Sequence, residues 1–198
     1  MEQLIIPQVT VTRSGNEISL SPYSYEYSYN RTIYLTGRID DMTAMAIVAQ
    51  LRTLRSISSD EITMLINSPG GSVTAGKAVI DAMKTCGCEI GTVCIGVAAS
   101  MAAVILASGT KGKRKIHEHA EVMIHQPLAG FEGQATDVSI MCRHLEKIKD
   151  ESVKMLADAT GRSIEEVRAD IERDNWMDAE EAVRYGICDG IEGGHDHE

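Results

Sequence analysis

The sequence predicts an α/β fold with a largely parallel sheet, and two observations support this. Short apolar runs rich in Ile, Val and Leu alternate along the chain with longer segments whose apolar residues recur every three or four positions. The first pattern indicates buried strands and the second amphipathic helices, and their alternation is typical of a parallel sheet covered by helices. The length of 198 residues fits one domain better than two. The composition, 43% apolar and 24% charged, is that of a globular protein and not of a disordered chain.

Each expected element has a local signal of its own. The longest helix is expected over 134–159, where apolar residues recur at alternating spacings of three and four. Two short helices open with capping boxes, Ser163 with Glu166 and Asp178 with Glu181. The other expected elements are helices at 43–57, 74–84 and 101–107, strands at 32–37, 62–66, 92–95, 121–125 and 187–191, and a tight turn at 96–100.

The uncharged segment 90–110, followed by the basic run 111–115, has the length and the flank of a membrane helix. Its glycines and serines dilute the apolar character, and it divides into a strand, a small-residue turn and a short helix that ends at Gly109. We therefore expect no membrane span, and we expect the basic run to be a solvated turn. The first residues carry Glu2 and lack a basic start, so they do not predict a secretory signal.

The two ends of the chain lie outside this alternation of strands and helices. Four tyrosines occupy alternate positions from Tyr23 to Tyr29, a period that predicts an extended aromatic-faced segment, most simply an edge strand. This segment belongs to an N-terminal part of the chain, residues 1–31. At the other end, residues 193–198 predict a flexible tail whose two histidines form no specific metal site.

Composition also limits which binding partners and which cellular compartment are expected. Nineteen basic against 29 acidic residues give a net charge of −10, which repels phosphate backbones and argues against a nucleic-acid partner. We expect the cysteines to be buried, reduced thiols in a reducing, cytoplasmic setting, without disulfides or a bound metal, because no CxxC pair occurs. The five are Cys86, Cys88, Cys94, Cys142 and Cys188.

Three residues are candidates for a nucleophile, a base and an orienting acid. Ser100 lies at the expected strand-to-helix turn among small residues, although a serine there is more often a simple helix cap. His125 ends a strand before a proline turn, at a sheet rim where α/β active sites form, and is equally compatible with a structural histidine. Asp174 is the remaining carboxylate by elimination, because Asp170 lies within a helix and Asp178 serves as a cap.

Backbone N–H groups can complete such a site. Met101 is the first residue of the expected helix, so its N–H has no partner within that helix and can stabilise an oxyanion. Gly70-Gly71 follows a strand and precedes a helix, which exposes N–H groups to an anion. A phosphate-binding loop is the alternative for this turn, but the lysine and the glycine spacing of such loops are missing.

Four segments of the sequence are distinctive in combination: INSPGGSVTAG (66–76), GVAASMAAVILASGTKGKR (96–114), VMIHQPLAGFEGQATD (122–137) and ERDNWMDAEEAVRYGICDGI (172–191). Together they resemble the proteolytic subunit of the ATP-dependent Clp protease, the ClpP family, over about Ile33 to Ile191. The resemblance implies a ClpP/crotonase-like spiral of βαβ units in a peptidase domain of residues 32–192. The long helix at 134–159 would protrude from it as a handle.

The resemblance also implies the chemistry. It makes the chain a serine endopeptidase with Ser100 as nucleophile, His125 as base and Asp174 as the residue that orients the base. The oxyanion hole would be formed by the backbone N–H groups of Gly71 and Met101. Such a mechanism requires no metal and no organic cofactor.

The family's assembly supplies the expected partners. Its subunits form two stacked seven-membered rings joined through the handle helix, and Glu172 and Arg173 match charges that pair between the rings. An AAA+ unfoldase ATPase feeds unfolded polypeptides into the chamber after docking in an apolar groove. In this chain the matching groove is more polar and predicts weak docking by this subunit alone. The groove positions are Thr63, Leu65, Val93, Ile95, Lys115 and His117.

Two other functions remain open at this point. The chain can be a weakly active structural subunit of a mixed ring that it forms with a second paralogue, and the polar groove favours this alternative. A crotonase-type acyl-CoA enzyme shares the scaffold and the oxyanion geometry, but it leaves Ser100 with His125 unexplained.

Overall fold

The structure, a computed structural model, describes residues 8–13 and 15–193 of the chain. Its centre is a seven-stranded sheet in which β3, β4, β5, β6 and β9 lie side by side in that order, while β7 pairs with β5 and β8 with β7. Among the described strands of this sheet, β8 alone runs antiparallel to its neighbour, so the predicted α/β fold with a largely parallel sheet is confirmed. The strands are β3 (Thr32–Thr36), β4 (Ile62–Ser68), β5 (Ile90–Ala99), β6 (Arg114–His117), β7 (Glu121–Ile124), β8 (Asn175–Met177) and β9 (Gly190–Glu192).

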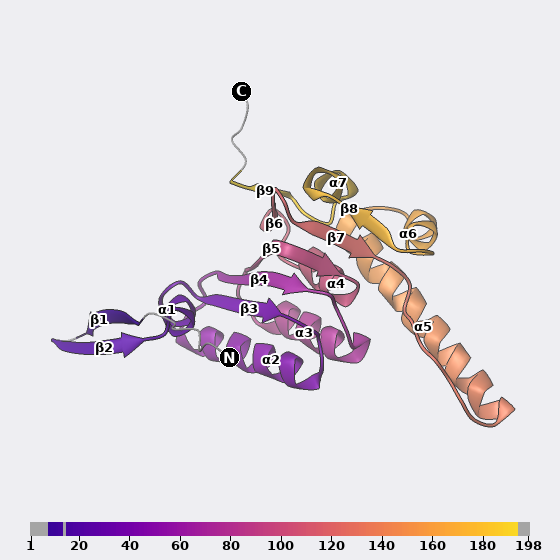
Figure 1. The fold of residues 1–198 in the computed structure, drawn as a ribbon, viewed down its shortest axis with the longest axis horizontal. Helices are drawn as coiled ribbons and strands as arrows, with labels where there is room; N and C mark the ends of the chain where they lie inside the picture. The colour runs from indigo at the N-terminus through magenta and orange to yellow at the C-terminus, as the bar shows by residue number, and fades with distance from the viewer. Residues whose placement is uncertain (1–7, 14, 194–198) are drawn as a thin grey trace, which may run out of the picture.

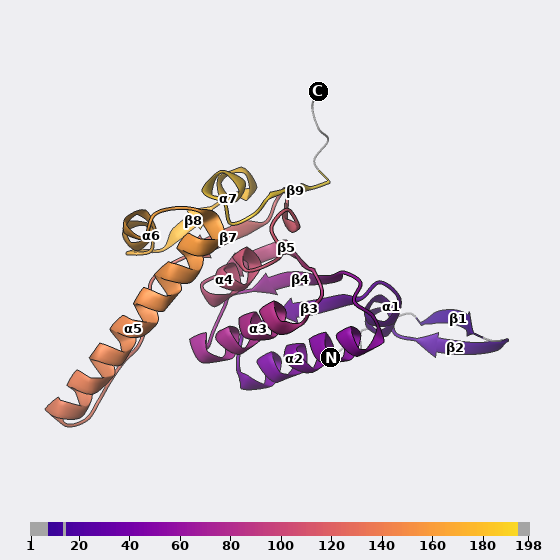
Figure 2. The same ribbon diagram turned by 180° about the vertical axis from the view of Figure 1, so that it is seen from behind.

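Three helices connect successive parallel strands and pack against the sheet (Figures 1 and 2). They are α2 (Asp41–Ile57), α3 (Val73–Thr85) and α4 (Met101–Ala107). The buried residues of α2, Ala44, Ile47, Leu51 and Leu54, recur every three or four positions on one face, and every residue of α4 is buried. Their apolar faces and the isoleucines of β3 and β4 form one core, which fixes the end of β5 and the start of α4 in place.

The ten-residue strand β5 joins the two halves of the sheet. Residues 92–94 pair with β6, whereas residues 97–99 pair with β7. The predicted turn at 96–100 is therefore wrong, because the strand continues to Ala99 and the chain reverses at Ser100. The hydrogen bonds from residues 97–99 to β7 stabilise an extended backbone, and nothing in the local pattern reveals that partner.

The long helix α5 (Ala135–Thr160) projects away from the sheet (Figure 1). Its buried residues, from Ser152 to Ala157, lie in its C-terminal half, while Ile140 and Met141 in the other half are exposed. Part of its apolar stripe is thus uncovered within one chain. The following helices α6 (Ile164–Asp170) and α7 (Ala179–Tyr185) open with the two predicted capping boxes, which are confirmed.

The N-terminal part of the chain corrects the sequence prediction. The tyrosine segment Tyr23–Tyr29 lies in a helix, α1 (Pro22–Tyr29), and is not extended. Ser21 accepts a hydrogen bond from the Ser24 N–H at 3.1 Å, and Pro22 occupies the first turn, so local capping outweighs the period of two. In the helix, Tyr25 stacks on Tyr29 with ring centroids 4.9 Å apart.

A hairpin of β1 (Val9–Arg13) and β2 (Asn16–Leu20), which the sequence did not predict, precedes α1 at the end of the molecule opposite α5 (Figure 1). The closing strand predicted at 187–191 is shorter and later, as β9. Of the tail predicted at 193–198, residues 194–198 lie outside the described residues.

The basic run is not a solvated turn throughout. Arg114 opens β6 and is 4% exposed. Its Nη2 lies 2.5 Å from Asp189 Oδ1, and its Nη1 donates to the carbonyls of Ala107 and Ala159 at 3.2 and 2.9 Å. The partner is 75 residues away in sequence, so the local pattern could not show that this arginine is buried.

The segment 90–110 forms β5 and α4, and none of the helices in the described residues is both long enough and apolar enough to cross a membrane. All five cysteines are free thiols. Cys94 and Cys188 are buried as predicted. The prediction of burial is wrong for Cys86 and Cys88, which are partly exposed, and for Cys142, which is exposed.

Candidate active site

Ser100 lies on the sharp turn between β5 and α4. Its φ of +56° is in the left-handed region, which residues other than glycine rarely adopt, and its backbone N–H donates to the Met123 carbonyl at 2.8 Å. The Ser100 hydroxyl makes no cap hydrogen bond to α4. The structure therefore contradicts the alternative of a simple capping serine and leaves the hydroxyl for another partner.

That partner is His125, and Asp174 lies behind it. His125 Nε2 is 2.9 Å from Ser100 Oγ, and His125 Nδ1 is 3.0 Å from Asp174 Oδ1. The His125 side chain is 15% exposed, whereas that of Asp174 is 63% exposed. The sequence-derived candidates thus form one chain of hydrogen bonds, with both distances in the range expected for a nucleophile, its base and an orienting carboxylate.

Strand register explains why these three residues meet. β7 runs parallel to β5 with Met123 opposite Ala99, so the residues that follow the two strands lie side by side. β8 runs antiparallel to β7 with Asn175 opposite Ile124, which places the preceding residue, Asp174, opposite His125. Each candidate side chain therefore lies directly beyond the end of a strand, where it is not part of the sheet.

The two candidate oxyanion N–H groups belong to Gly71 and to Met101, the residue that follows Ser100. In the parallel bridge between Ile39 and Gly71, the hydrogen bonds run from the Ile39 N–H to the Gly70 carbonyl and from the Ser72 N–H to the Ile39 carbonyl. The Gly71 N–H therefore points away from Ile39. Met101 is the first residue of α4, so its N–H has no partner within the helix.

Close packing holds the glycine turn against the Ser100 turn. A Cβ on Gly70, which has a φ of +86°, would lie 2.5 Å from the Ala99 carbonyl oxygen and 2.8 Å from Ser100 Cβ. A Cβ on Gly71 would lie 2.1 Å from the Ile39 carbonyl oxygen. Both positions require glycine, because a side chain at Gly70 would collide with the Ser100 turn and one at Gly71 with the backbone of Ile39.

A small recess adjoins Ser100 and His125. Its polar wall residue is Ser152 of α5, whose hydroxyl already donates to the Ile148 carbonyl at 2.9 Å. The rest of the wall is apolar, so it suits an apolar side chain of a bound chain better than a charged one. The apolar wall consists of Val73, Met101, Val104, Ile124, Pro127 and Leu156.

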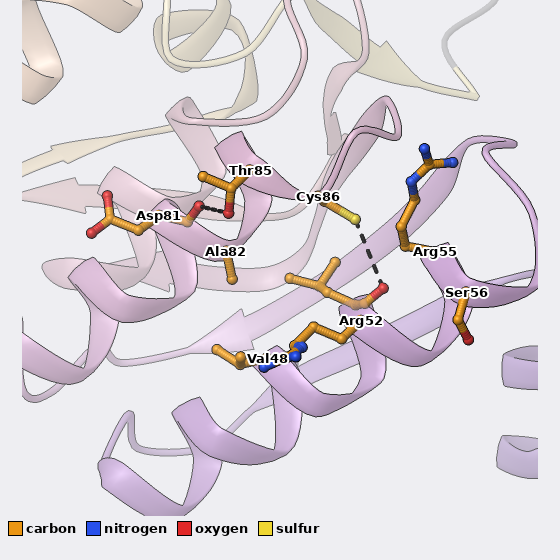
Figure 3. A pocket seen from close by; sticks show the side chains of 9 residues that line it. Val48, Arg52, Arg55, Ser56, Asp81, Ala82, Thr85 and Cys86 are labelled. Atoms are coloured by element: carbon orange, nitrogen blue, oxygen red, sulfur yellow. Dashed lines mark hydrogen bonds between the residues drawn. The ribbon is translucent and has the colours of Figure 1, made fainter.

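A larger cavity, of about 510 Å³, lies between α2 and α3 (Figure 3). Among the described residues its wall contains no member of the hydrogen-bonded chain and no histidine. Cavity size alone would place the site there. A serine, a histidine and an aspartate joined by hydrogen bonds say more about possible chemistry than the volume of a cavity does. We therefore take the recess at Ser100 as the candidate active site.

Lys149 of α5 connects the two loops that carry His125 and Asp174. Its Nζ donates to Gln126 Oε1 at 2.9 Å and to Glu172 Oε2 at 3.3 Å, and Gln126 Nε2 donates to the Glu172 carbonyl at 2.9 Å. The hydrogen bond and the charge of the Lys149 ammonium lower the pKa of Glu172, which favours its ionised carboxylate. Neither Lys149 nor Gln126 was predicted from the sequence. Gln126 could have been found because it adjoins His125, but no local signal relates Lys149 to the site.

We expect Lys149→Met to lower kcat for a peptide substrate by about 3- to 30-fold with little change in KM, because the two loops lose their shared anchor. Lys149→Arg should restore most of the rate. Lys154→Met is the matched control, since Lys154 is an exposed lysine of the same helix with no hydrogen bond to another side chain in the described part of the chain. Equal rates for Lys149→Met and Lys154→Met in a steady-state assay would contradict the role of Lys149.

Glu172 and Arg173, the predicted inter-ring charges, are both exposed and adjoin Asp174. Glu172 already pairs with Lys149 within the chain, whereas Arg173 has no ion pair among the described residues. Their contact between rings stays a prediction.

The residues predicted to line a docking groove lie on one face of three neighbouring strands. Leu65 of β4 is opposite Val93 of β5, which is opposite Lys115 of β6. On β3, Tyr34 is opposite Leu65, and the Tyr23 ring of α1 meets it edge-on with centroids 5.2 Å apart. The structure thus adds aromatic surface next to a groove that the sequence alone predicted to be polar at Thr63, Lys115 and His117.

Comparison with known families agrees with this arrangement. A family model described as Clp protease matches residues 15–194, which include the whole seven-stranded sheet, α5 and the three hydrogen-bonded residues. The match covers most of the chain and confirms the resemblance found in the four sequence segments. The chain therefore belongs to the Clp protease family, a family of peptidases.

Proposed function

We propose that the chain is a serine endopeptidase, the proteolytic ring subunit of an ATP-dependent protease that cleaves unfolded polypeptides to short peptides in an enclosed chamber. The observation that carries the proposal is the hydrogen-bonded chain from Ser100 through His125 to Asp174. Membership of a peptidase family supports the choice of a peptide bond as the substrate.

In the proposed mechanism, Ser100 Oγ attacks the peptide carbonyl carbon and passes its proton to His125 Nε2. The N–H groups of Gly71 and Met101 donate to the oxyanion that forms. His125 then gives the proton to the leaving amine, and a water molecule hydrolyses the acyl-enzyme by the same route. Asp174 accepts a hydrogen bond from His125 Nδ1 and so holds the imidazole in the tautomer that leaves Nε2 free to take the proton. These steps require no metal ion or organic cofactor.

The assembly belongs to the same proposal. We expect two stacked seven-membered rings in the cytoplasm, joined through α5, with an AAA+ unfoldase as the ATP-consuming partner. The exposed Ile140 and Met141 on the projecting half of α5 support self-association, because burying an exposed apolar stripe is favourable at about 25 cal/mol per Å².

A serine-directed phosphonate tests the serine mechanism and its dependence on assembly together. We expect a single adduct on Ser100 in the assembled protein, as judged by native mass and peptide mapping, with loss of cleavage of a fluorogenic peptide. Dissociated subunits should label more slowly, since Glu172 and Arg173 adjoin Asp174. An adduct elsewhere would refute the nucleophile, and equal labelling of dissociated subunits would refute the link to assembly.

A mixed ring with a second paralogue is the alternative, and the polar positions of the docking groove favour it. In that case the purified chain alone would cleave the fluorogenic peptide poorly despite its intact hydrogen-bonded chain. The crotonase-type acyl-CoA alternative gives the contact between Ser100 and His125 no role, and thioester turnover would distinguish it.

We expect Thr63→Tyr with His117→Leu to increase ATPase-dependent degradation of a tagged folded substrate by rings of this chain alone. The change adds apolar surface next to Tyr34 and replaces the exposed imidazole of His117 with an apolar side chain, so that docking buries more apolar area. Peptide cleavage without ATPase is the control and should stay constant. Tight ATPase docking by the wild type, unchanged in the double variant, would show that this groove does not limit the partnership.

A further inference from the structure

Two cysteines with one glycine between them follow the end of α3, far in sequence from the proposed active site. Cys86 is the C-cap residue of α3, and Gly87 has a φ of +75°, so the chain bends over residues 86–88. Two residues of extended chain span at most about 7 Å, and a bend shortens that span. The two Cα atoms are therefore close enough for a disulfide, which needs a separation below about 6.8 Å.

Both sulfurs face the C-terminal part of α2. Cys86 Sγ donates to the Leu51 carbonyl and Cys88 Sγ to the Ser58 carbonyl, each at 3.7 Å. A thiol is a weak donor, so losing these contacts costs little. Both residues are partly exposed, and Cys86 lines the 510 Å³ cavity between α2 and α3, where Figure 3 shows it pointing across to the α2 backbone. Small solutes can therefore reach the pair.

Two guanidinium groups flank this pair. Arg31 Nη2 lies 3.8 Å from Cys88 Sγ. Arg55 lies over the glycine between the cysteines, with its Nε 3.3 Å from where a Cβ of Gly87 would be. Positive charge stabilises a thiolate, which is the reactive form of cysteine. The direct contact between Arg31 and the Cys88 sulfur places Cys88 to react first, while burial and the neighbouring Cys88 raise the pKa of Cys86.

We infer that Cys86 and Cys88 form a redox-active dithiol that hydrogen peroxide converts into an intramolecular disulfide. The Cys88 thiolate attacks one peroxide oxygen, the O–O bond breaks, and a sulfenic acid and hydroxide result. The Cys86 sulfur then attacks the Cys88 sulfur, the S–O bond breaks, and the departing hydroxide and the Cys86 proton form water. Two thiols and one peroxide thus give one disulfide and two waters, with two electrons passing from sulfur to peroxide.

The other cysteines of the chain serve as internal comparisons. Cys94 and Cys188 are also near each other, but burial raises the pKa of Cys94 to about 11 and that of Cys188 to about 12, so both stay as thiols. Cys142 is exposed on α5 and has no second cysteine beside it in the described structure. The inference does not depend on the role of Ser100.

The test treats the native protein with hydrogen peroxide, blocks remaining thiols with iodoacetamide and digests it at Lys84 and Glu89. The resulting peptide, residues 85–89, contains Cys86 and Cys88 and no other cysteine. We expect this peptide to be unalkylated and lighter by two hydrogen atoms, and dithiothreitol to reverse the change. Peptides with Cys94 and Cys188 should remain reduced.

Single variants separate the two roles. Cys86→Ser should leave Cys88 as a sulfenic acid that dimedone traps, Cys88→Ser should leave Cys86 unmodified at the same exposure, and Cys142→Ser should not change disulfide formation. The inference is overturned if the 85–89 peptide carries sulfinic acid or stays fully alkylated. It is equally overturned if oxidation gives Cys142-linked dimers instead, or if the disulfide forms after denaturation but not in the native protein.

Discussion

Replacing Ser100 with alanine is expected to lower the rate of peptide cleavage by about 10⁶-fold while leaving the fold and the assembly unchanged. The hydroxyl makes no cap hydrogen bond to α4, so alanine removes the group that contacts His125 and no structural contact. The φ of +56° at position 100 is unfavourable for serine and alanine alike, and the small neighbouring residues leave room for either side chain. Fluorogenic peptide cleavage measures the loss, and native mass checks the assembly.

Ser108→Ala is the matched control at the other end of α4. The Ser108 hydroxyl donates to the Val104 carbonyl at 2.7 Å, so this variant also loses a serine hydroxyl but not one near His125. It should retain most of the activity. His125→Ala should cost about as much as Ser100→Ala, and the double variant little more, because residues that act as a unit are not additive. Retention of even one per cent of the activity by Ser100→Ala would remove Ser100 from the mechanism.

The sequence pointed to Ser100 and His125 because each lies where a regular element begins or ends. Ser100 lies at a strand-to-helix turn and His125 follows a short apolar strand, and both features are visible in a local window. Asp174 was reached by elimination alone. Its position depends on β8, a strand of three residues whose antiparallel pairing with β7 has no local signal.

The features that the sequence did not reveal depend on contacts with residues far away in sequence or on the capping of a helix. The tyrosine segment follows a period of two, yet Ser21 and the proline after it start a helix there. Lys149 looks like one of several lysines on a polar helix face until the fold brings Gln126 and Glu172 to it. Arg114 looks like part of a solvated basic run for the same reason, since its partner Asp189 is 75 residues away.

Among the changes that we predict, loss of the ion pair between Arg114 and Asp189 has the largest effect on stability. Four donors converge on the Asp189 carboxylate: the Gly112 N–H at 2.7 Å and the N–H, Nε and Nη2 of Arg114 at 2.9, 3.0 and 2.5 Å. Asp189→Asn turns an amide NH₂ toward these donors and leaves a guanidinium that is 4% exposed without its counter-charge. Breaking a buried pair in this way costs about 3–5 kcal/mol in the free energy of unfolding, which lowers Tm by roughly 10 °C in a chain of this size.

The pH dependence follows from the direction of the pKa shift. Burial alone would raise the pKa of Asp189, but the hydrogen bonds and the charge of Arg114 lower it overall. The pair therefore stabilises the folded state above the ordinary aspartate pKa of about 3.9, and this contribution is lost as pH falls through the lowered value. Asp189→Asn has no such carboxylate, so its deficit relative to the wild type should be full at pH 7 and should shrink below about pH 4.

Two further variants decide between a buried ion pair and a general effect of lost charge. Asp158→Asn removes an exposed aspartate of α5 that has no side-chain hydrogen bond among the described residues, and it should change Tm by little. Arg114→Met combined with Asp189→Leu removes both charges and should recover much of the stability lost in Asp189→Asn, because an apolar pair avoids the unpaired buried charge. Thermal unfolding of the four proteins provides the comparison. If Asp158→Asn and Asp189→Asn are equally stable, Arg114 is solvated in solution and this pair does not hold β6 to the ends of α4 and α5.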